Sequence, residues 1–490
     1  MRLEDLGLDR RLVAALVIGT LAAVGAGYLV AAGLDGGDGR TAAVAAPAVS
    51  PEAQDDGPLG EPPILPPVTG GTPPPVPTPM PATTAAAPAP PPTTAAPPAT
   101  TAPPAVTPPP ATTTRPPTTT ATAPPPFRPR PASAPLAEFV VPPQELPPDA
   151  ATATAGLARA AARARPETAT ATDIGYVTRL GARFATTGVD GRREAVSRTL
   201  RVNAWWYARR GAPAGRVLVR DPDGLIYSYN AGHGLALNPV GTAGRWQRLN
   251  ADVTAQALSD TLMSVGVTST RAGRRTLSWE YFDVPGEPAT IRPGVSGMAQ
   301  ARIAQLIAGA YNATGDPRYA AAAGDAMASL AVDVDAGGAR GMVAYPAGAP
   351  PSPWYVERAY PGEAPWTGAA LNGFMVAILE LRIAERSLRD APAAAGDPSV
   401  AQIADEARRL ADEGAAVLQR YLPLHDSGKW SYYGLLTPGH PWRTYLANAT
   451  YHCYHVTLLR SLAEAYPDRT FGATAGKWAG YATRQGVRCP

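Results

Sequence analysis

The chain has 490 residues, which by length alone could hold two or three domains. Its 43 Lys and Arg residues nearly balance its 40 Asp and Glu residues, and the formal net charge is +3. No basic stretch is interleaved with aromatic residues, which excludes an ordinary nucleic-acid-binding protein.

The N-terminal residues predict a membrane anchor. An uncharged apolar run from Leu12 to Leu34 is long enough to cross about 30 Å of hydrocarbon as a helix. Three arginines precede the run and two aspartates follow it, which places residues 1–11 in the cytoplasm and the rest outside. A cleaved signal peptide is the alternative, and either reading exports the remainder. We expect a single-pass protein of the cell membrane with its C-terminal domain outside the cytoplasm.

Residues 35–167 predict a disordered linker rich in Pro, Thr and Ala. Well over half of the 57 prolines lie between Pro47 and Pro148, with little charge and few aromatic residues. Such a composition cannot bury enough apolar surface to offset the entropy of ordering. We expect an extended tether with polyproline II character between the membrane and a folded domain at 168–490.

The folded domain is predicted to be mainly α, with one small β-hairpin at 216–229. Asp221-Pro222-Asp223-Gly224 supplies the turn of that hairpin. From Ser296 an apolar i, i+3, i+4, i+7 stripe predicts a helix that ends at Gly315. Further helices are expected at 317–331, 367–388, 399–424 and 448–466. Helices joined by short Gly, Asp and Pro turns indicate an antiparallel array, which could close as an α/α toroid.

Two long polar loops interrupt these helices, at 345–366 and 425–445. Both are rich in Trp and Tyr. Long loops on a rigid helical scaffold are where binding and catalytic residues usually lie. We therefore expect the functional site to be built from these loops and from the helix ends beside them.

Five stretches in this domain together resemble the C-terminal catalytic domain of the D-glucuronyl C5-epimerases. In chain order they are SGMAQARIAQLIAGAY, ERAYP, LNGFMVAILEL, LPLHDSGKWSYYGL and YHCYHVTLLRSL. The likeness runs from Ser296 to about Tyr481 and is absent from the linker and the anchor. It implies an isomerase that converts glucuronate to iduronate within a polysaccharide, with no cofactor and no metal.

The resemblance also implies the site residues. The family's proposed catalytic tyrosines match Tyr360 of ERAYP, Tyr433 and Tyr451, and the interval 451 − 433 = 18 agrees with the family. Glu357 stands near the first tyrosine, displaced by a small insertion, and is a candidate base. The implied substrate-binding residues are Arg358, Asn372, Arg443, His452 and His455. One departure is Leu436, which stands where the family has an arginine.

Tyrosines suit this reaction on chemical grounds. Epimerisation at C5 removes a proton α to a carboxylate and returns one on the opposite face, so it needs a base and an acid on opposite sides of the ring. A tyrosine with a pKa near ~10 needs a cationic neighbour before it can act as a base. Arg358, Arg443 and Arg460 are the candidate cations.

Other interpretations of the same residues stay open. Tyrosines in helical chains are more often structural than catalytic. His452 and His455 share a helix face, but no third ligand at a convincing spacing completes a metal site. Cys453 is either a packed residue or the disulfide partner of Cys489.

The function itself also has alternatives. The same carbanion could expel the 4-linked sugar, which would make the protein a polysaccharide lyase. A glycoside hydrolase would need a carboxylate pair, for which Glu363, Glu380 and Asp426 are candidates. A domain without activity that binds envelope glycans is the third alternative.

Overall fold

The computed structural model of the protein describes residues 136–249, 253–284, 290–344, 349–362, 369–434 and 446–489. No helix in these ranges is long and apolar enough to cross a membrane. The predicted span at 12–34 lies outside the described residues and stays a prediction, and so do the positions of Glu363, Leu436 and Arg443.

The first part of the fold combines helices with a four-stranded sheet of order β1-β2-β3-β4. Strand β1 pairs with β2 in parallel, and the other pairs are antiparallel. The helices α3 and α4 pack on β4, and α2 packs on α4. The elements are β1 (Ala137–Val140), α2 (Ala150–Arg163), α3 (Ala169–Phe184), α4 (Asp190–Tyr207), β2 (Val217–Arg220), β3 (Ile226–Asn230), β4 (Gly234–Leu237), α5 (Pro239–Leu249) and α6 (Ala255–Val265).

This part corrects the predicted linker boundary at residue 167. Strand β1 and helix α2 both precede it, and Ala153, Leu157 and Ala160 of α2 are buried in the core. The boundary was misplaced because α2 is built largely from Ala and Thr and has one bulky apolar residue. By composition it resembles the tether, although Asp149 caps it and its alanine face packs closely.

Three antiparallel two-stranded ribbons follow in chain order. They pair β5 (Val267–Arg271) with β6 (Arg274–Ser278), β7 (Glu280–Asp283) with β8 (Ile291–Val295), and β9 (Arg340–Val343) with β10 (Ser352–Tyr355). The predicted hairpin at 216–229 is confirmed as β2 and β3, but the sequence did not predict the additional strands, which are only four or five residues long.

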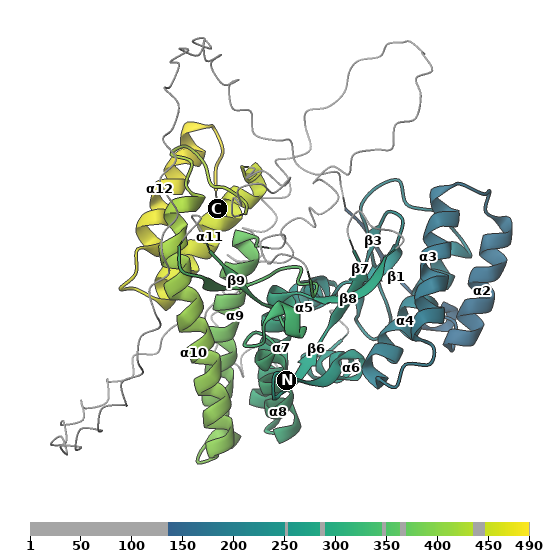
Figure 1. The fold of residues 1–490 in the computed structure, drawn as a ribbon, viewed down its shortest axis with the longest axis horizontal. Coiled ribbons are helices and arrows are strands. Elements are labelled where there is room, and N and C mark those ends of the chain that lie inside the picture. The colour runs from purple at the N-terminus through teal and green to yellow at the C-terminus, as the bar shows by residue number, and fades with distance from the viewer. Residues whose placement is uncertain are drawn as a thin grey trace, which may run out of the picture. The chain divides into compact units, whose positions relative to one another are not determined.

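In the described residues, helices α7 to α12 form the rest of the fold (Figure 1). Helix α7 packs against α8 and α9, α9 packs against α10 and α11, and α11 packs against α12. They are α7 (Gly297–Thr314), α8 (Pro317–Ala328), α9 (Leu371–Arg389), α10 (Pro398–Tyr421), α11 (Ala449–Ala465) and α12 (Phe471–Arg484).

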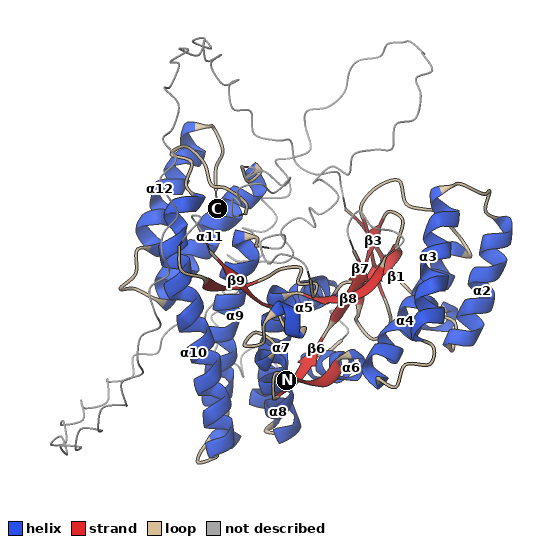
Figure 2. Ribbon diagram, viewed as in Figure 1, coloured by secondary structure: helices blue, strands red, loops and turns tan. Residues whose placement is uncertain are grey.

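The helix ends follow the predicted signals. The Ser296 side chain accepts a hydrogen bond from the Ala299 N–H at the start of α7. Gly315 ends that helix with a φ of 69°, and Asp316 caps α8 with Pro317 in its first turn. The prediction of a mainly α domain with small β elements is confirmed (Figure 2). The toroidal closure of the helices stays a prediction.

A disulfide joins Cys453 of α11 to Cys489 beyond α12, with 4.9 Å between the Cα atoms. This decides between the two interpretations of Cys453. The bond fastens the C-terminal end of the chain to the helix that carries Tyr451.

Candidate functional site

The predicted tyrosines Tyr433 and Tyr451 meet at the N-terminal end of α9. The Leu371 N–H, at the first residue of α9, donates to the Tyr433 carbonyl at 2.8 Å, and Ala370 forms a β-bridge with Gly434. The chain around Tyr433 is therefore fixed to a helix end that has no side-chain cap of its own.

Tyr451 approaches Tyr433 from α11. Asn448 caps that helix by accepting from the Tyr451 N–H at 2.8 Å, which places Tyr451 in the first turn. The two rings pack edge to face, with 4.8 Å between their centroids and an interplanar angle of 77°. Tyr451 is buried, and Tyr433 is partly buried against the core. Two residues 18 positions apart thus share one site.

A histidine–serine–histidine cluster lies behind this pair. The Oγ of Ser431 is 2.8 Å from Nδ1 of His452 and 2.9 Å from Nδ1 of His455. The Ser431 N–H also donates to His452 Nδ1, at 3.2 Å, and His452 Nε2 lies 3.0 Å from the Trp478 carbonyl. His452 therefore carries its proton on Nε2 and accepts at Nδ1.

The tautomer of His455 follows from the single proton of the serine hydroxyl. If that proton is given to His452, the contact with His455 is a hydrogen bond only when the Nδ1 of His455 is the donor. This assignment leaves Nε2 of His455 as an acceptor. That atom is buried and has no hydrogen-bond partner among the described residues.

Both histidines are held in the neutral form. Burial lowers the pKa of His452 to about 4 and lowers that of His455 well below its usual value. His425 is a third buried histidine held in the neutral form. Burial lowers its pKa to about 4, and its Nδ1 faces the Tyr432 carbonyl at 3.4 Å. Sequence reasoning missed Ser431 and His425, although both lie in the loop that it marked as functional.

Glu357 lies at the same end of α9. Its Oε2 would stand only 3.1 Å from a Cβ placed on Gly373, so the carboxylate rests against the first turn of the helix. The N-terminal dipole of a helix stabilises negative charge at such a position. Asn372, in the same turn, is buried, and its Oδ1 has no hydrogen-bond partner among the described residues.

Tyr360 is only three residues from Glu357 but belongs to a different set of contacts. The segment is bonded to β8 through Ala359 and Val295, and the Tyr360 ring lies directly on Gly294. Its hydroxyl donates to the Asp283 carbonyl at 2.8 Å. Burial, opposed by the charge of Arg358, raises the pKa of Tyr360 to about 12.

The predicted cations occupy distinct positions. Arg358 bonds Asp283 Oδ2 at 3.2 Å and stacks over Tyr281. Arg460 lies on the exposed side of α11. Arg443 lies outside the described residues. A further arginine, Arg302 of α7, donates to the Tyr454 hydroxyl at 3.3 Å, and sequence reasoning did not identify it because it lies within an apolar helix stripe.

The glycosidase candidates have structural partners. Glu380 forms a buried ion pair with Arg302, with 3.2 Å between Oε1 and Nε. Asp426 accepts from the indole of Trp478 and the hydroxyl of Tyr481 and pairs with Lys477. In the part of the chain that the structure describes, no three His, Cys, Asp or Glu side chains gather closely enough to hold a metal ion.

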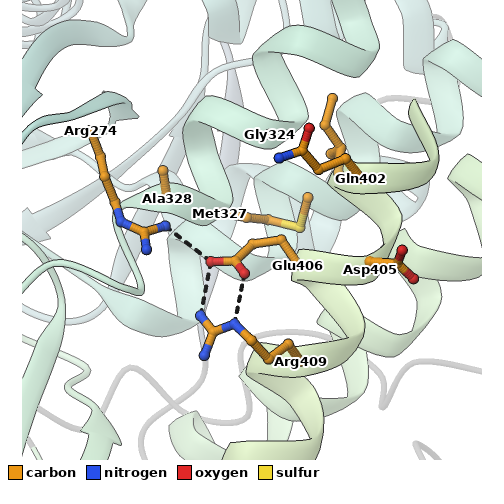
Figure 3. A pocket seen from close by; sticks show the side chains of 9 residues that line it. Arg274, Gly324, Met327, Ala328, Gln402, Asp405, Glu406 and Arg409 are labelled. Carbon is orange, nitrogen blue, oxygen red and sulfur yellow. Dashed lines mark hydrogen bonds and ion pairs between the residues drawn. The ribbon is translucent and has the colours of Figure 1, made fainter. Parts of the chain in front are cut away.

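A separate hollow lies between β6, α8 and α10 (Figure 3). Within it the Glu406 carboxylate bonds Arg274 at 3.1 Å and Arg409 at 2.7 and 2.8 Å. These charges largely neutralise one another. None of the predicted site residues that the structure describes lines this hollow, so it is not the candidate site.

Comparison with known proteins places these contacts in a family context. Residues 274–480 match the family described as the D-glucuronyl C5-epimerase C-terminus. A D-glucuronyl C5-epimerase from Caenorhabditis elegans is 29% identical over 187 residues, which are 38% of this chain and 28% of that relative. The resemblance expected from the sequence motifs is confirmed for this region. It contains every predicted site residue from Glu357 to His455, whereas the four-stranded sheet lies outside it.

Proposed function

We propose that the protein is a uronyl C5-epimerase that converts glucuronate to iduronate within a polysaccharide. The observation that supports this most strongly is the contact of Tyr433 with Tyr451, beside Glu357, inside the region that matches the family. The chain spans only 28% of the length of the curated relative. The activity is therefore proposed from the geometry of the site and not carried over from that relative.

The geometry suits the removal and return of a proton at C5. A carbanion forms next to the sugar carboxylate, and its negative charge must be met by hydrogen-bond donors. Glu357 beside the α9 terminus is the candidate base. Tyr451 and Tyr433 bring two phenol rings into contact beside it, and their hydroxyls are the candidate donors that meet the charge of the carbanion.

Tyr360 suits the role of acid better than that of base. With a pKa raised to about 12 it keeps its proton, and its hydroxyl already acts as a donor to the Asp283 carbonyl. We propose that it delivers a proton or a hydrogen bond to the sugar from the side opposite Glu357. Arg358 holds Asp283 in place beneath it.

The substrate-binding roles of Arg358, Asn372, Arg443, His452 and His455 remain part of the proposal. His452 is engaged on both ring nitrogens by protein groups, so it acts on substrate only through Ser431 and the loop. Asn372 and His455 each keep a buried acceptor atom in the same region.

We further propose that the domain is exported and tethered to the membrane by residues 12–34. The disulfide between Cys453 and Cys489 supports export, because such bonds form and persist in oxidising compartments. The substrate is then a uronate polymer of the cell envelope or its surroundings.

Product analysis tests the reaction class. The full-length protein is incubated with an unsulfated heparosan-type polymer, and the products are analysed by NMR. Iduronate in an intact chain supports the epimerase. Shortened chains with an unsaturated terminal uronate would show that the protein is a lyase. Binding without any change in the polymer would show that it is a glycan-binding domain.

A further inference from the structure

The acceptor of the Tyr360 hydroxyl lies at the end of a buried strand. Tyr360 donates at 2.8 Å to the main-chain carbonyl of Asp283, the last residue of β7. Asp283 itself is 3% exposed and carries a carboxylate in this interior position. A buried carboxylate is costly unless other groups donate hydrogen bonds to it. The groups that fix Asp283 therefore also fix the acceptor of the Tyr360 hydroxyl.

Two donors hold the Asp283 carboxylate. Its Oδ2 accepts from Nδ2 of Asn230, in β3, at 2.7 Å and from Nη1 of Arg358 at 3.2 Å. Its Oδ1 is buried and has no hydrogen-bond partner among the described residues. Because an ionised carboxylate can only accept, the amide of Asn230 must present its N–H at this contact. The shorter of the two bonds thus comes from the four-stranded sheet.

Helix α3 holds the preceding residue of the same strand. The hydroxyl of Tyr176 donates to the main-chain carbonyl of Phe282, and the rings of Phe184 and Phe282 pack with 5.2 Å between their centroids. Tyr176 is buried. Two successive carbonyls of β7 therefore accept from two tyrosines, Tyr176 at Phe282 and Tyr360 at Asp283.

These supports come from outside the region that matches the family. Asn230 and Tyr176 both precede residue 274, where that region begins, whereas Asp283 and Tyr360 lie within it. The part of the fold that contains the four-stranded sheet is thus hydrogen-bonded to the strand end on which the candidate acid rests.

We propose that Asn230 and Tyr176 are positioning residues that fix the end of β7 and, through Asp283, aim the hydroxyl of Tyr360 at C5 of the sugar. This inference rests on the proposed function, in which Tyr360 is the acid opposite Glu357. It makes the N-terminal part of the fold necessary for inversion at C5, although the family match does not extend to it.

The fate of the carbanion reports the position of Tyr360. Glu357 takes the proton from C5, and the electron pair of that bond stays on the sugar. A proton from the Tyr360 hydroxyl then gives iduronate and leaves a phenolate, which regains a proton from solvent while Glu357 releases its own. A proton returned by Glu357 gives glucuronate again. In deuterated water, exchange at Glu357 marks this second product with deuterium at C5.

The test measures the ratio of iduronate to C5-deuterated glucuronate at early times. The full-length protein carrying Asn230→Leu is incubated with a heparosan-type polymer in deuterated water, and the products are quantified by NMR. Leucine keeps the branch at Cγ and removes the amide donor. We expect the ratio to fall about tenfold and KM to change no more than about twofold. Unfolded protein forms neither product, so lost stability alone leaves the ratio unchanged.

Tyr176→Phe is the second variant, and it removes only the hydroxyl bonded to Phe282. It should lower the ratio in the same direction as Asn230→Leu. A wild-type ratio in both variants would overturn the inference.

A readout without substrate separates the inference from the proposed function. The Cζ atom of Tyr360 is followed by NMR in protein labelled with ¹³C at the tyrosine Cζ atoms, and Tyr360→Phe identifies its signal. Its chemical shift depends on the hydrogen bond of the hydroxyl and should change in Asn230→Leu. An unchanged shift would contradict the inference. Wild-type protein without any exchange at C5 would overturn the proposed function, and the Cζ shift would still decide whether Asn230 positions Tyr360.

Two matched controls lie elsewhere in the fold. Asn312 of α7 donates from Nδ2 to the Ser387 carbonyl at 2.9 Å, and the buried Tyr421 donates to the Val343 carbonyl of β9 at 2.9 Å. Asn312→Leu and Tyr421→Phe therefore remove the same kinds of bond without touching β7. Both should keep the wild-type product ratio and the wild-type Cζ shift of Tyr360. A lowered ratio in these controls as well would contradict a specific role for Asn230.

Discussion

The ring of Tyr433 meets the ring of Tyr451 edge to face at 4.8 Å, although one residue belongs to a loop and the other to a helix. The loop is held by backbone bonds to the first turn of α9, and the helix is capped by Asn448. Ser431 ties the two together through His452 and His455. The contact between the tyrosines thus depends on groups that hold the loop to the helix.

Replacing Ser431 with Ala should weaken both the fold and the activity. The change removes hydrogen bonds to two buried imidazoles, and each unpaired buried polar group costs about 1–3 kcal/mol. We expect a loss of about 2–4 kcal/mol in the free energy of unfolding, measured by urea denaturation, and a fall in kcat. Ser264→Ala is the control, because that hydroxyl bonds only the exposed Thr261 carbonyl of its own helix. Equal stability of the two variants would contradict the described cluster.

Stability should fall with acid between about pH 6.5 and pH 4. The pKa values of His425 and His452 are lowered to about 4 in the fold by burial, whereas an unfolded histidine titrates near ~6.5. The unfolded state therefore binds more protons in this interval, and the stabilising contribution is complete above it and lost as pH falls through it. Urea denaturation at several pH values measures this loss. The pH slope should be smaller in His452→Gln, and an unchanged slope would contradict neutral burial of His452.

Gly373→Ala should reduce activity without reducing stability. A Cβ at this position would stand 3.1 Å from Glu357 Oε2, so the candidate base must shift. Alanine in a helix interior is favoured over glycine by about 1 kcal/mol, which offsets the crowding. We expect kcat for C5 exchange to fall about tenfold. Gly309→Ala in α7 is the control, because a Cβ there meets no atom within 4 Å. Full activity in Gly373→Ala would contradict the assignment of Glu357 as the base.

The disulfide should contribute substantially to stability. Cys453 and Cys489 close a loop with a sequence separation of 36, for which the chain-entropy relation gives about 4 kcal/mol. A reductant should lower the urea midpoint of the wild type and leave that of the variant Cys453→Ala with Cys489→Ala unchanged. If reduction had no effect on the wild type, the bond would not be formed in the protein.

Much of the scaffold could be predicted from the sequence because its signals are local. Asn448 as a cap, the turn at Gly315 and the 18-residue interval from Tyr433 to Tyr451 depend on short stretches of chain. The predicted start of the folded part was too late in the chain. An alanine-rich helix such as α2 has the composition of a linker, and only its packing in the fold distinguishes the two.

The detailed site could not be predicted because its contacts are long-range. Glu357 and Tyr360 are neighbours in sequence, but hydrogen bonds between Ala359 and Val295 turn the chain, so one faces α9 and the other faces β8. Ser431 joins two histidines more than 20 residues away, and Arg302 meets Tyr454 across 152 residues. No periodicity or motif spacing encodes these pairings.

The most direct test of the account is solvent-deuterium incorporation at C5 of glucuronate in an unsulfated heparosan-type polymer. It should be measured with the full-length wild type and with Tyr451→Phe and Tyr433→Phe, after circular dichroism has shown that both variants fold. The account predicts deuterium at C5 and iduronate in an uncleaved chain with the wild type, and exchange reduced at least about 100-fold in each variant. Exchange at the wild-type rate in both variants would contradict the assignment of the tyrosines, and no exchange with the wild type would contradict the epimerase itself.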